Sequence, residues 1–117
     1  MSLVLDAERG LVVVAGCGHA GVINTLEFAR ERIRAAPVVA VVGGLHLFDA
    51  DGAALDWTAD KLRGMGIGHL LGAHCTGIEA VHVLRGRLGL DRRTCVVGAV
   101  GSVFELGEGI RPGTIAR

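Results

Sequence analysis

A thiol and an imidazole lie two residues apart in a glycine-rich stretch of this 117-residue chain. Cys17 and His19 fall within residues 16–24, which follow the apolar run 11–15 and open a helical pattern over residues 22–33. A short apolar run is typical of a buried strand, and apolar side chains three and four residues apart indicate a helix. Because open α/β sheets bind ligands where their strands end, this loop is a candidate site.

Two further apolar runs end in side chains of the same kinds. His46 follows the run 37–42 and two glycines, whereas His74 and Cys75 follow the run 67–71. Strands that alternate with helices pack as parallel neighbours, so the sequence predicts that these groups share one edge of a sheet. Nitrogen and sulfur donors on one edge suit zinc or a similar transition metal. The alternative, that each is a packed or hydrogen-bonded loop residue, stays open at this stage.

The three cysteines are expected to be reduced thiols. Their number is odd and the chain has no signal peptide, which together favour a cytoplasmic location. Cys95 lies in the apolar run 94–97 and is expected in the core. Cys17 and Cys75 are each either an additional soft metal ligand or, the favoured role, a small buried apolar side chain.

The other polar residues near these motifs have simpler interpretations. Thr76 precedes Glu79 by three residues, a spacing typical of a helix capping box, and Gly77 is expected to form a tight turn. His69 and His82 have no motif around them. We interpret both as structural or surface histidines.

The first glycine loop also fits a different kind of site. Gly16, Gly18 and Gly21 match the G-x-G-x-x-G pattern of a dinucleotide-binding turn, whose amides hold a pyrophosphate. That pattern requires an acidic residue about 20 positions later to bind the ribose. Residues 39–44 contain none, and Asp49 comes after the strand has ended. A full nicotinamide site is therefore excluded, whereas anion binding by the loop amides remains an alternative.

Three ordered motifs resemble one branch of the metallo-β-lactamase superfamily. Members of this branch are described as metal-dependent hydrolases or as resembling dihydropterin ribofuranosyl-aminobenzene phosphate synthases. The resemblance covers the carboxyl-terminal half of that fold and nearly the whole of this chain. The family usually has serine where Gly18 stands. The motifs, in order, are Gly16-Cys17-Gly18-His19-Ala20-Gly21-Val22-Ile23-Asn24, Gly43-Gly44-Leu45-His46-Leu47 and His74-Cys75-Thr76-Gly77.

The resemblance implies a divalent-metal site. It assigns His19 and His74 as metal-site residues and His46 as a third candidate. Zinc is the first choice of metal, with iron or manganese as alternatives. The implied activity is hydrolysis of a small-molecule ester, phosphoester or related substrate.

A motif that the family uses for most of its metal ligands does not occur in this sequence. No His-x-His-x-Asp-His segment is present among the 117 residues. We therefore expect this chain alone to bind metal weakly or not at all and to be inactive as a hydrolase. The alternative function is a noncatalytic α/β module that binds a small phosphate-bearing ligand or serves as an oligomerisation unit.

Composition predicts one compact domain over residues 1–117. Half of the residues are hydrophobic and 21% are charged, which is ordinary for a globular protein. The net charge of zero and 3% aromatic content do not favour nucleic-acid binding. No apolar stretch is long enough to predict a membrane span.

The predicted fold class is α/β, as half of a metallo-β-lactamase αββα fold with a mixed, mostly parallel sheet. One face of that sheet would then lack its partner half, so we expect a homo-oligomer or an amino-terminal partner half. A self-contained domain with helices on both faces is the alternative. The predicted strands are 3–5, 11–15, 38–42, 68–72 and 94–97, with an extended piece at 102–106, helices at 21–34, 55–65 and 77–88, and an irregular tail at 107–117.

Overall fold

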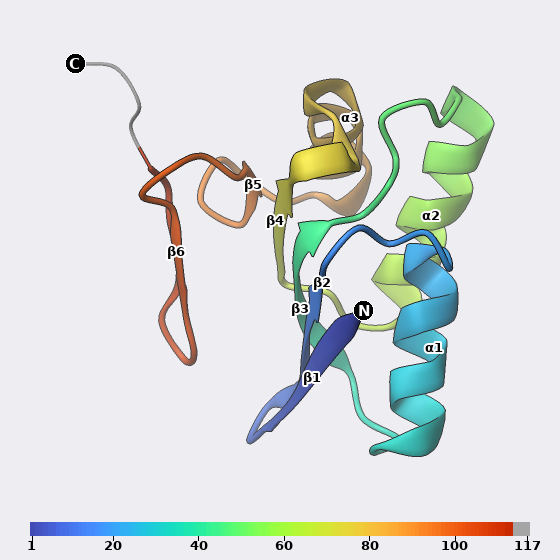
Figure 1. Ribbon diagram of the computed structural model, residues 1–117, viewed down its shortest axis with the longest axis vertical. Coiled ribbons are helices and arrows are strands. Elements are labelled where there is room, and N and C mark those ends of the chain that lie inside the picture. The colour runs from blue at the N-terminus through green and yellow to red at the C-terminus, as the bar shows by residue number, and fades with distance from the viewer. Residues whose placement is uncertain (114–117) are drawn as a thin grey trace.

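A computed structural model describes residues 1–113 and shows a mixed α/β fold (Figure 1). The predicted helices and strands all form, with small changes at their ends. The strands are β1 (Ser2–Ala7), β2 (Gly10–Ala15), β3 (Val38–Gly44), β4 (His69–Ala73), β5 (Cys95–Val97), β6 (Val103–Glu105) and β7 (Gly109–Arg111). The helices are α1 (Val22–Arg32), α2 (Gly52–Gly64) and α3 (Ile78–Leu88), with a 3₁₀ turn, η1, at His74–Thr76.

The main sheet has its five strands in sequence order, β1-β2-β3-β4-β5. The pair β1–β2 is an antiparallel hairpin, whereas β2, β3, β4 and β5 run parallel to one another. The predicted mixed, mostly parallel sheet is therefore confirmed. Because the loops after β2, β3 and β4 leave the same edge, all three chemical motifs of the sequence come together there.

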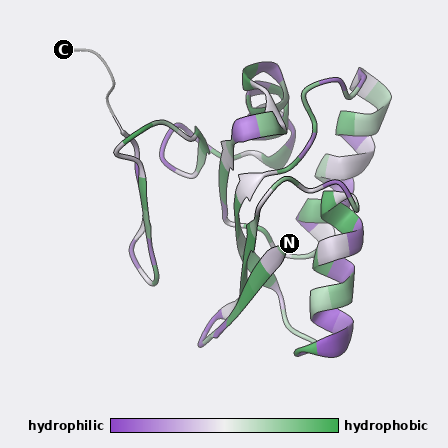
Figure 2. Cartoon of the chain, in the orientation of Figure 1, coloured by the Kyte–Doolittle hydropathy of each residue, from purple (hydrophilic) through white to green (hydrophobic). Residues whose placement is uncertain are grey.

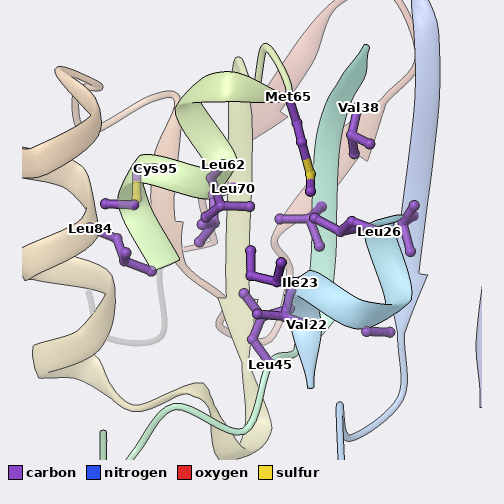
Figure 3. Packing of buried hydrophobic residues seen from close by; sticks show 14 of the residues in the cluster. Val22, Ile23, Leu26, Val38, Leu45, Leu62, Met65, Leu70, Leu84 and Cys95 are labelled. Carbon is purple, nitrogen blue, oxygen red and sulfur yellow. The ribbon is translucent and has the colours of Figure 1, made fainter. Parts of the chain in front are cut away.

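All three helices contribute to one hydrophobic core on one face of the sheet (Figure 3). Leu26 of α1, Leu62 of α2 and Leu84 of α3 are completely buried, and Leu70 of β4 packs in the same cluster. Figure 2 shows apolar residues along the strands, whereas polar and apolar residues alternate on the helices. Within residues 1–113, no helix covers the opposite face, so the alternative of helices on both faces is not observed.

The second face of the sheet is covered in part by the β6–β7 hairpin. Neighbouring residues of a strand point to opposite faces, and Leu71, next to Leu70, packs with Val96 and Ile110 in a separate cluster. The prediction of an irregular tail is therefore wrong at Gly109–Arg111. Positive φ at Gly107 (83°) and Gly109 (101°) reverses the chain so that β7 pairs with β6. Residues 114–117 of the predicted tail lie outside the described residues.

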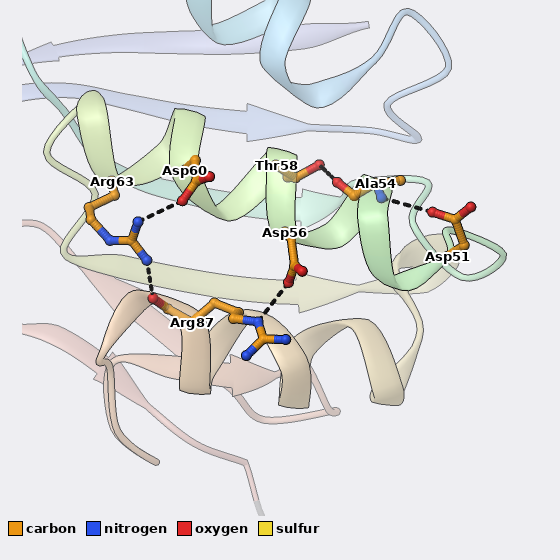
Figure 4. A network of polar contacts seen from close by, with 7 residues as sticks. All are labelled: Asp51, Ala54, Asp56, Thr58, Asp60, Arg63 and Arg87. Atoms are coloured by element: carbon orange, nitrogen blue, oxygen red, sulfur yellow. Dashed lines mark hydrogen bonds and ion pairs between the residues drawn. The ribbon is translucent and has the colours of Figure 1, made fainter.

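Exposed polar contacts link α2 to its surroundings (Figure 4). Asp51 caps the helix by accepting from the backbone N–H of Ala54 at 2.8 Å. Arg87 of α3 pairs with Asp56 at 2.6 Å, and Arg63 bonds to Asp60 and to the carbonyl of Arg87. Such exposed pairs contribute little to stability, typically less than about 1 kcal/mol each. The buried core described above therefore holds the helices on the sheet.

No helix of the described residues is long and apolar enough to cross a bilayer.

Gly43, near the end of β3, allows the sheet to close tightly beside the candidate site. Its φ is 116°, and a Cβ atom there would overlap the carbonyl oxygen of Ala15 on β2. We predict that Gly43→Ala lowers the free energy of unfolding by at least about 2 kcal/mol, because it adds backbone strain to a steric clash.

The control is Gly86→Ala in α3, where a Cβ would meet no atom within 4 Å. This change should raise stability by about 0.5–1 kcal/mol, since alanine favours a helix interior. Urea unfolding of both variants tests the pair. Equal stability of Gly43→Ala and the unmodified chain would contradict the tight β2–β3 approach.

Candidate metal centre

The buried hydroxyl of Thr76 ties together two of the three loops at the candidate site. It accepts a hydrogen bond from the Leu45 N–H at 3.0 Å. Its own proton is within reach of the Ala73 carbonyl (2.8 Å) and the Gly43 carbonyl (3.1 Å). The loop after β3 and the turn after β4 are thus fixed relative to one another.

This role of Thr76 differs from the capping box that the sequence indicates. Gly77, with a φ of 87°, is the N-cap residue of α3, and no side chain caps that end of the helix. Thr76 is completely buried, and its hydroxyl contacts the carbonyls of Gly43 on β3 and Ala73 on β4. Instead of accepting a hydrogen bond from an N–H group in the first turn of α3, the Thr76 hydroxyl accepts one from the Leu45 N–H, which is distant in the sequence.

His46 and His74 both have left-handed backbone conformations, with φ of 53°. Such values are uncommon outside glycine, and non-glycine residues with them concentrate at functional sites. The N–H groups of Leu47 and Phe48 both reach the Cys75 carbonyl at 3.2 Å, so the backbone around His46 is bonded to the turn that contains His74. These contacts fix the backbone positions from which both imidazoles project.

Five nitrogen and sulfur donors gather where β2, β3 and β4 end. One group of three consists of Cys17, His19 and His46, and a second consists of Cys17, His74 and Cys75. Within each group, one donor atom of every residue lies within 4.8 Å of the others. The three imidazoles are exposed, and the two thiols are half-buried.

Contacts within the cluster agree with this arrangement. The His19 and His46 ring centroids are 4.5 Å apart, and His46 also lies edge-on to Phe48 at 5.4 Å. His19 and His74 fall in different groups, but both have a donor atom within 4.8 Å of Cys17 Sγ. The structure therefore brings all the predicted metal-site residues to one edge of the sheet.

The two thiols are in direct contact, which the sequence did not reveal. Cys17 Sγ and Cys75 Sγ are 3.4 Å apart, and Cys75 Sγ also lies 3.2 Å from the Cys17 carbonyl. The hydrogen bond with Cys75, together with burial, raises the pKa of the Cys17 thiol. Gly44 leaves room for the pair, since a Cβ there would lie 3.2 Å from Cys75 Sγ. Both thiols are thus oriented toward the histidines as well as partly buried.

The remaining histidines and the third cysteine lie outside the donor groups of the described residues. Cys95 is fully buried in the core, as predicted, and burial raises the pKa of its thiol to about 11. His69 is half-buried on β4, with its ring 6.0 Å from that of Phe104. His82 is exposed on α3.

Two of the three glycine amides in the loop after β2 donate hydrogen bonds within the chain. The Gly16 amide donates to the Met1 carbonyl at 3.0 Å, and the Gly21 amide donates to the Gly18 carbonyl at 2.9 Å. These amides already have acceptors, which argues against their use as an anion cradle. Gly18 has a φ of 64°, and a Cβ there would lie 2.9 Å from the Gly44 carbonyl oxygen. Glycine therefore fits this position without steric conflict.

We predict that Thr76→Val lowers the free energy of unfolding by about 1–3 kcal/mol, because the buried Leu45 amide loses its acceptor. Thr76→Ser is the matched control, since it keeps the hydroxyl and removes a methyl group, at a cost of about 1 kcal/mol. Urea unfolding compares the two variants. If the valine variant is at least as stable as the serine variant, the hydroxyl does not hold the loops.

Comparisons with known proteins give partial matches. No family model matches the chain. The chain is 34% identical over 80 residues to 7,8-dihydropterin-6-methyl-4-(β-D-ribofuranosyl)-aminobenzene-5′-phosphate synthase from Methanocaldococcus jannaschii, covering 68% of this chain and 27% of the relative. It is 27% identical over 70 residues to an uncharacterized protein of the same organism, covering 60% of this chain and 26% of that protein.

A solved structure gives a similar result. The crystal structure of a metal-dependent hydrolase of the β-lactamase superfamily superposes with a TM-score of 0.69 and 30% sequence identity, over 74% of this chain and 34% of that one. The chain thus spans about a quarter of the length of the curated relatives and about a third of the solved structure. In its mostly parallel sheet and its helices, this chain is similar to a metal-dependent hydrolase of the β-lactamase superfamily.

Proposed function

We propose that this chain forms part of the divalent-metal centre of a hydrolase. The observation that carries the proposal is the gathering of His19, His46 and His74 around Cys17 where β2, β3 and β4 end. The similarity to a metal-dependent hydrolase supports the same function. The Gly16 and Gly21 amides already have acceptors, which makes the phosphate-binding alternative less favourable.

The donors fit a transition metal better than a hard cation. Imidazole and thiol groups suit zinc first and iron second, whereas manganese prefers oxygen ligands. A bound zinc ion lowers the pKa of its water to about 7, which supplies a nucleophile for ester or phosphoester hydrolysis. The exposed imidazoles leave the site open to a small-molecule substrate. Free thiols in such a site require a reducing compartment, in agreement with a cytoplasmic location.

We infer that this chain does not complete the catalytic centre by itself. It spans about a third of the similar hydrolase, and its sequence contains no His-x-His-x-Asp-His segment. Groups outside these 117 residues would have to supply further ligands and orient the attacking water. The 117 residues alone are therefore expected to bind metal weakly and to show no appreciable hydrolytic turnover.

The test compares metal binding and hydrolysis in the purified chain and two variants. His19→Ala and His74→Asn should each weaken Zn²⁺ binding; asparagine is chosen at His74 because it tolerates the left-handed backbone. His82→Ala, on the exposed face of α3, is the control and should bind as the unmodified chain does. Metal analysis after equilibrium dialysis measures binding, and nitrophenyl ester and phosphodiester substrates measure turnover.

Absence of metal binding would reject the hydrolase proposal and favour a noncatalytic module. Zinc-dependent turnover that is lost in His74→Asn would show that this chain assembles a complete site. That result would overturn the inference of inactivity while supporting the proposed reaction.

We further propose that a second copy of the chain covers the uncovered part of the sheet in solution. Leu3 of β1 pairs with Val14, which pairs with Val42, so these side chains share the face opposite the helices. Leu3 is 59% exposed, and the other two are half-buried. Between this face and the β6–β7 hairpin lies a mainly apolar cavity of about 540 Å³. Exposed apolar side chains on a sheet face, beside an apolar cavity, favour association with another surface.

Light scattering of the purified chain should therefore give the mass of a dimer or larger oligomer. Leu3→Arg should shift it toward the monomer because a charge would be buried at the contact. Phe28→Arg is the control, since Phe28 is similarly exposed (60%) but lies on α1, on the helical side. A stable monomer at all concentrations would contradict self-association and leave a separate partner half as the alternative.

A further inference from the structure

We propose that Cys17 and Cys75 join in a reversible disulfide bond when a peroxide reaches this edge of the sheet. The two thiols come from segments 58 residues apart in the chain, and their sulfur atoms are in contact at 3.4 Å. The inference goes beyond the proposed hydrolase, because it concerns the reaction of the two thiols with each other and needs no metal ion. It assigns the pair as a site of oxidative modification.

The two sulfur atoms already lie close to bonding distance. A disulfide bond is about 2.05 Å long, so each sulfur has to move by less than about 1 Å. Cys75 Sγ also lies 3.2 Å from the Cys17 carbonyl oxygen, so the side chain of Cys75 packs against the backbone of Cys17. The remaining gap is within the reach of side-chain rotation.

The end of β3 leaves space for this contact because residue 44 is glycine. A Cβ atom there would overlap the Gly16 carbonyl oxygen and lie 3.2 Å from both Cys17 Cα and Cys75 Sγ. A side chain at this position would therefore press on both members of the pair. Gly44 thus keeps the space between the loop after β2 and the turn after β4 free for the two sulfur atoms.

Hydrogen bonds hold the backbone on each side of the pair. On one side, the Cys75 carbonyl accepts from the amides of Leu47 and Phe48, both at 3.2 Å. On the other side, the Gly16 amide donates to the Met1 carbonyl at 3.0 Å. The sulfur atoms therefore stay near each other in the reduced protein, which raises the effective concentration of each thiol at the other.

The pair is open to a small oxidant, whereas the third thiol is not. Cys17 and Cys75 are half-buried, but Cys95 has no exposed surface. Cys95 Sγ lies 3.6 Å from the Val81 carbonyl oxygen, within the hydrophobic core. Cys95 therefore serves as a reference thiol in the same chain that should not react.

The oxidation is a two-electron reaction with hydrogen peroxide. One thiol gives up its proton, its sulfur attacks a peroxide oxygen and breaks the O–O bond, and a sulfenic acid and hydroxide form. The second thiol gives up its proton, its sulfur attacks the sulfenic sulfur, and the disulfide forms as hydroxide leaves. The two protons and two hydroxide ions make two water molecules, so both sulfurs are oxidised and both peroxide oxygens are reduced. A small-molecule thiol reverses the modification by exchange.

The neighbouring thiol determines which product the oxidation gives. An isolated cysteine sulfenic acid is oxidised further to sulfinic acid, which thiols do not reverse, whereas a thiol in contact captures it as a disulfide. The new bond also closes a loop between the segments that follow β2 and β4, which restricts the unfolded chain. Oxidation should therefore be reversible and should raise the urea midpoint of unfolding.

The experiment treats the full 117-residue chain, freed of metal by a chelator, with a small molar excess of hydrogen peroxide. Alkylation after unfolding counts the free thiols, which should fall from three to one and return to three after reduction. Trypsin cuts after arginine and places the three cysteines in different peptides, so mass spectrometry shows which two are joined. The bond should join Cys17 to Cys75 within one chain, and the urea midpoint should rise.

Matched variants separate the pair from general thiol reactivity. Cys95→Ala should form the same bond as the unmodified chain and lose both of its remaining thiols. Cys75→Ser should form no bond within the chain, and peroxide should instead convert Cys17 to sulfinic acid, which a thiol reductant does not reverse. Circular dichroism verifies that each variant is folded before oxidation.

Three outcomes would overturn the inference. They are three free thiols after peroxide treatment, a disulfide that includes Cys95 or joins two chains, and sulfinic acid at Cys17 in the unmodified chain. Because the chain is free of metal in every sample, these outcomes are distinct from a failure of the proposed hydrolase centre, which is tested by metal binding.

Discussion

The hydrogen bonds of one buried hydroxyl determine how the loops of this protein meet. Thr76 Oγ1 joins the Leu45 amide to the turn after β4, in a position that water does not reach. A buried amide without an acceptor is costly, so the two loops cannot separate without breaking this contact. Among the described residues, every buried side-chain nitrogen or oxygen has a partner. The precision of the donor cluster therefore depends on polar bonds as well as on the apolar core beneath it.

The elements of this fold could be predicted from the sequence where apolar runs are long and regular. The runs that form β2, β3 and β4 have apolar side chains on both faces, as parallel strands do. Once these strands are parallel neighbours, topology alone places His19, His46 and His74 on one edge. The edge of the sheet that carries these residues could therefore be predicted from the sequence.

Two of the features that the sequence did not reveal depend on distant partners, and a third is a very short strand. A local pattern at Thr76 and Glu79 resembled a capping box, but the hydroxyl bonds to a loop 31 residues away. The contact between Cys17 and Cys75 spans 58 residues, which no local pattern can reveal. The strand β7 has only three residues and forms because two glycines turn it against β6. A strand of three residues is too short to give a recognisable pattern of apolar and polar residues in the sequence.

The left-handed histidines have a consequence for how this sequence can change. An L-residue pays roughly 1–2 kcal/mol for that conformation, and glycine does not. At positions 46 and 74, glycine would relieve this strain and at the same time remove a nitrogen donor. Selection for folded abundance alone would thus act against both histidines, whereas selection for the chemistry of the edge would retain them. The two pressures oppose each other at the same backbone positions, which is the form that a trade-off between stability and activity takes.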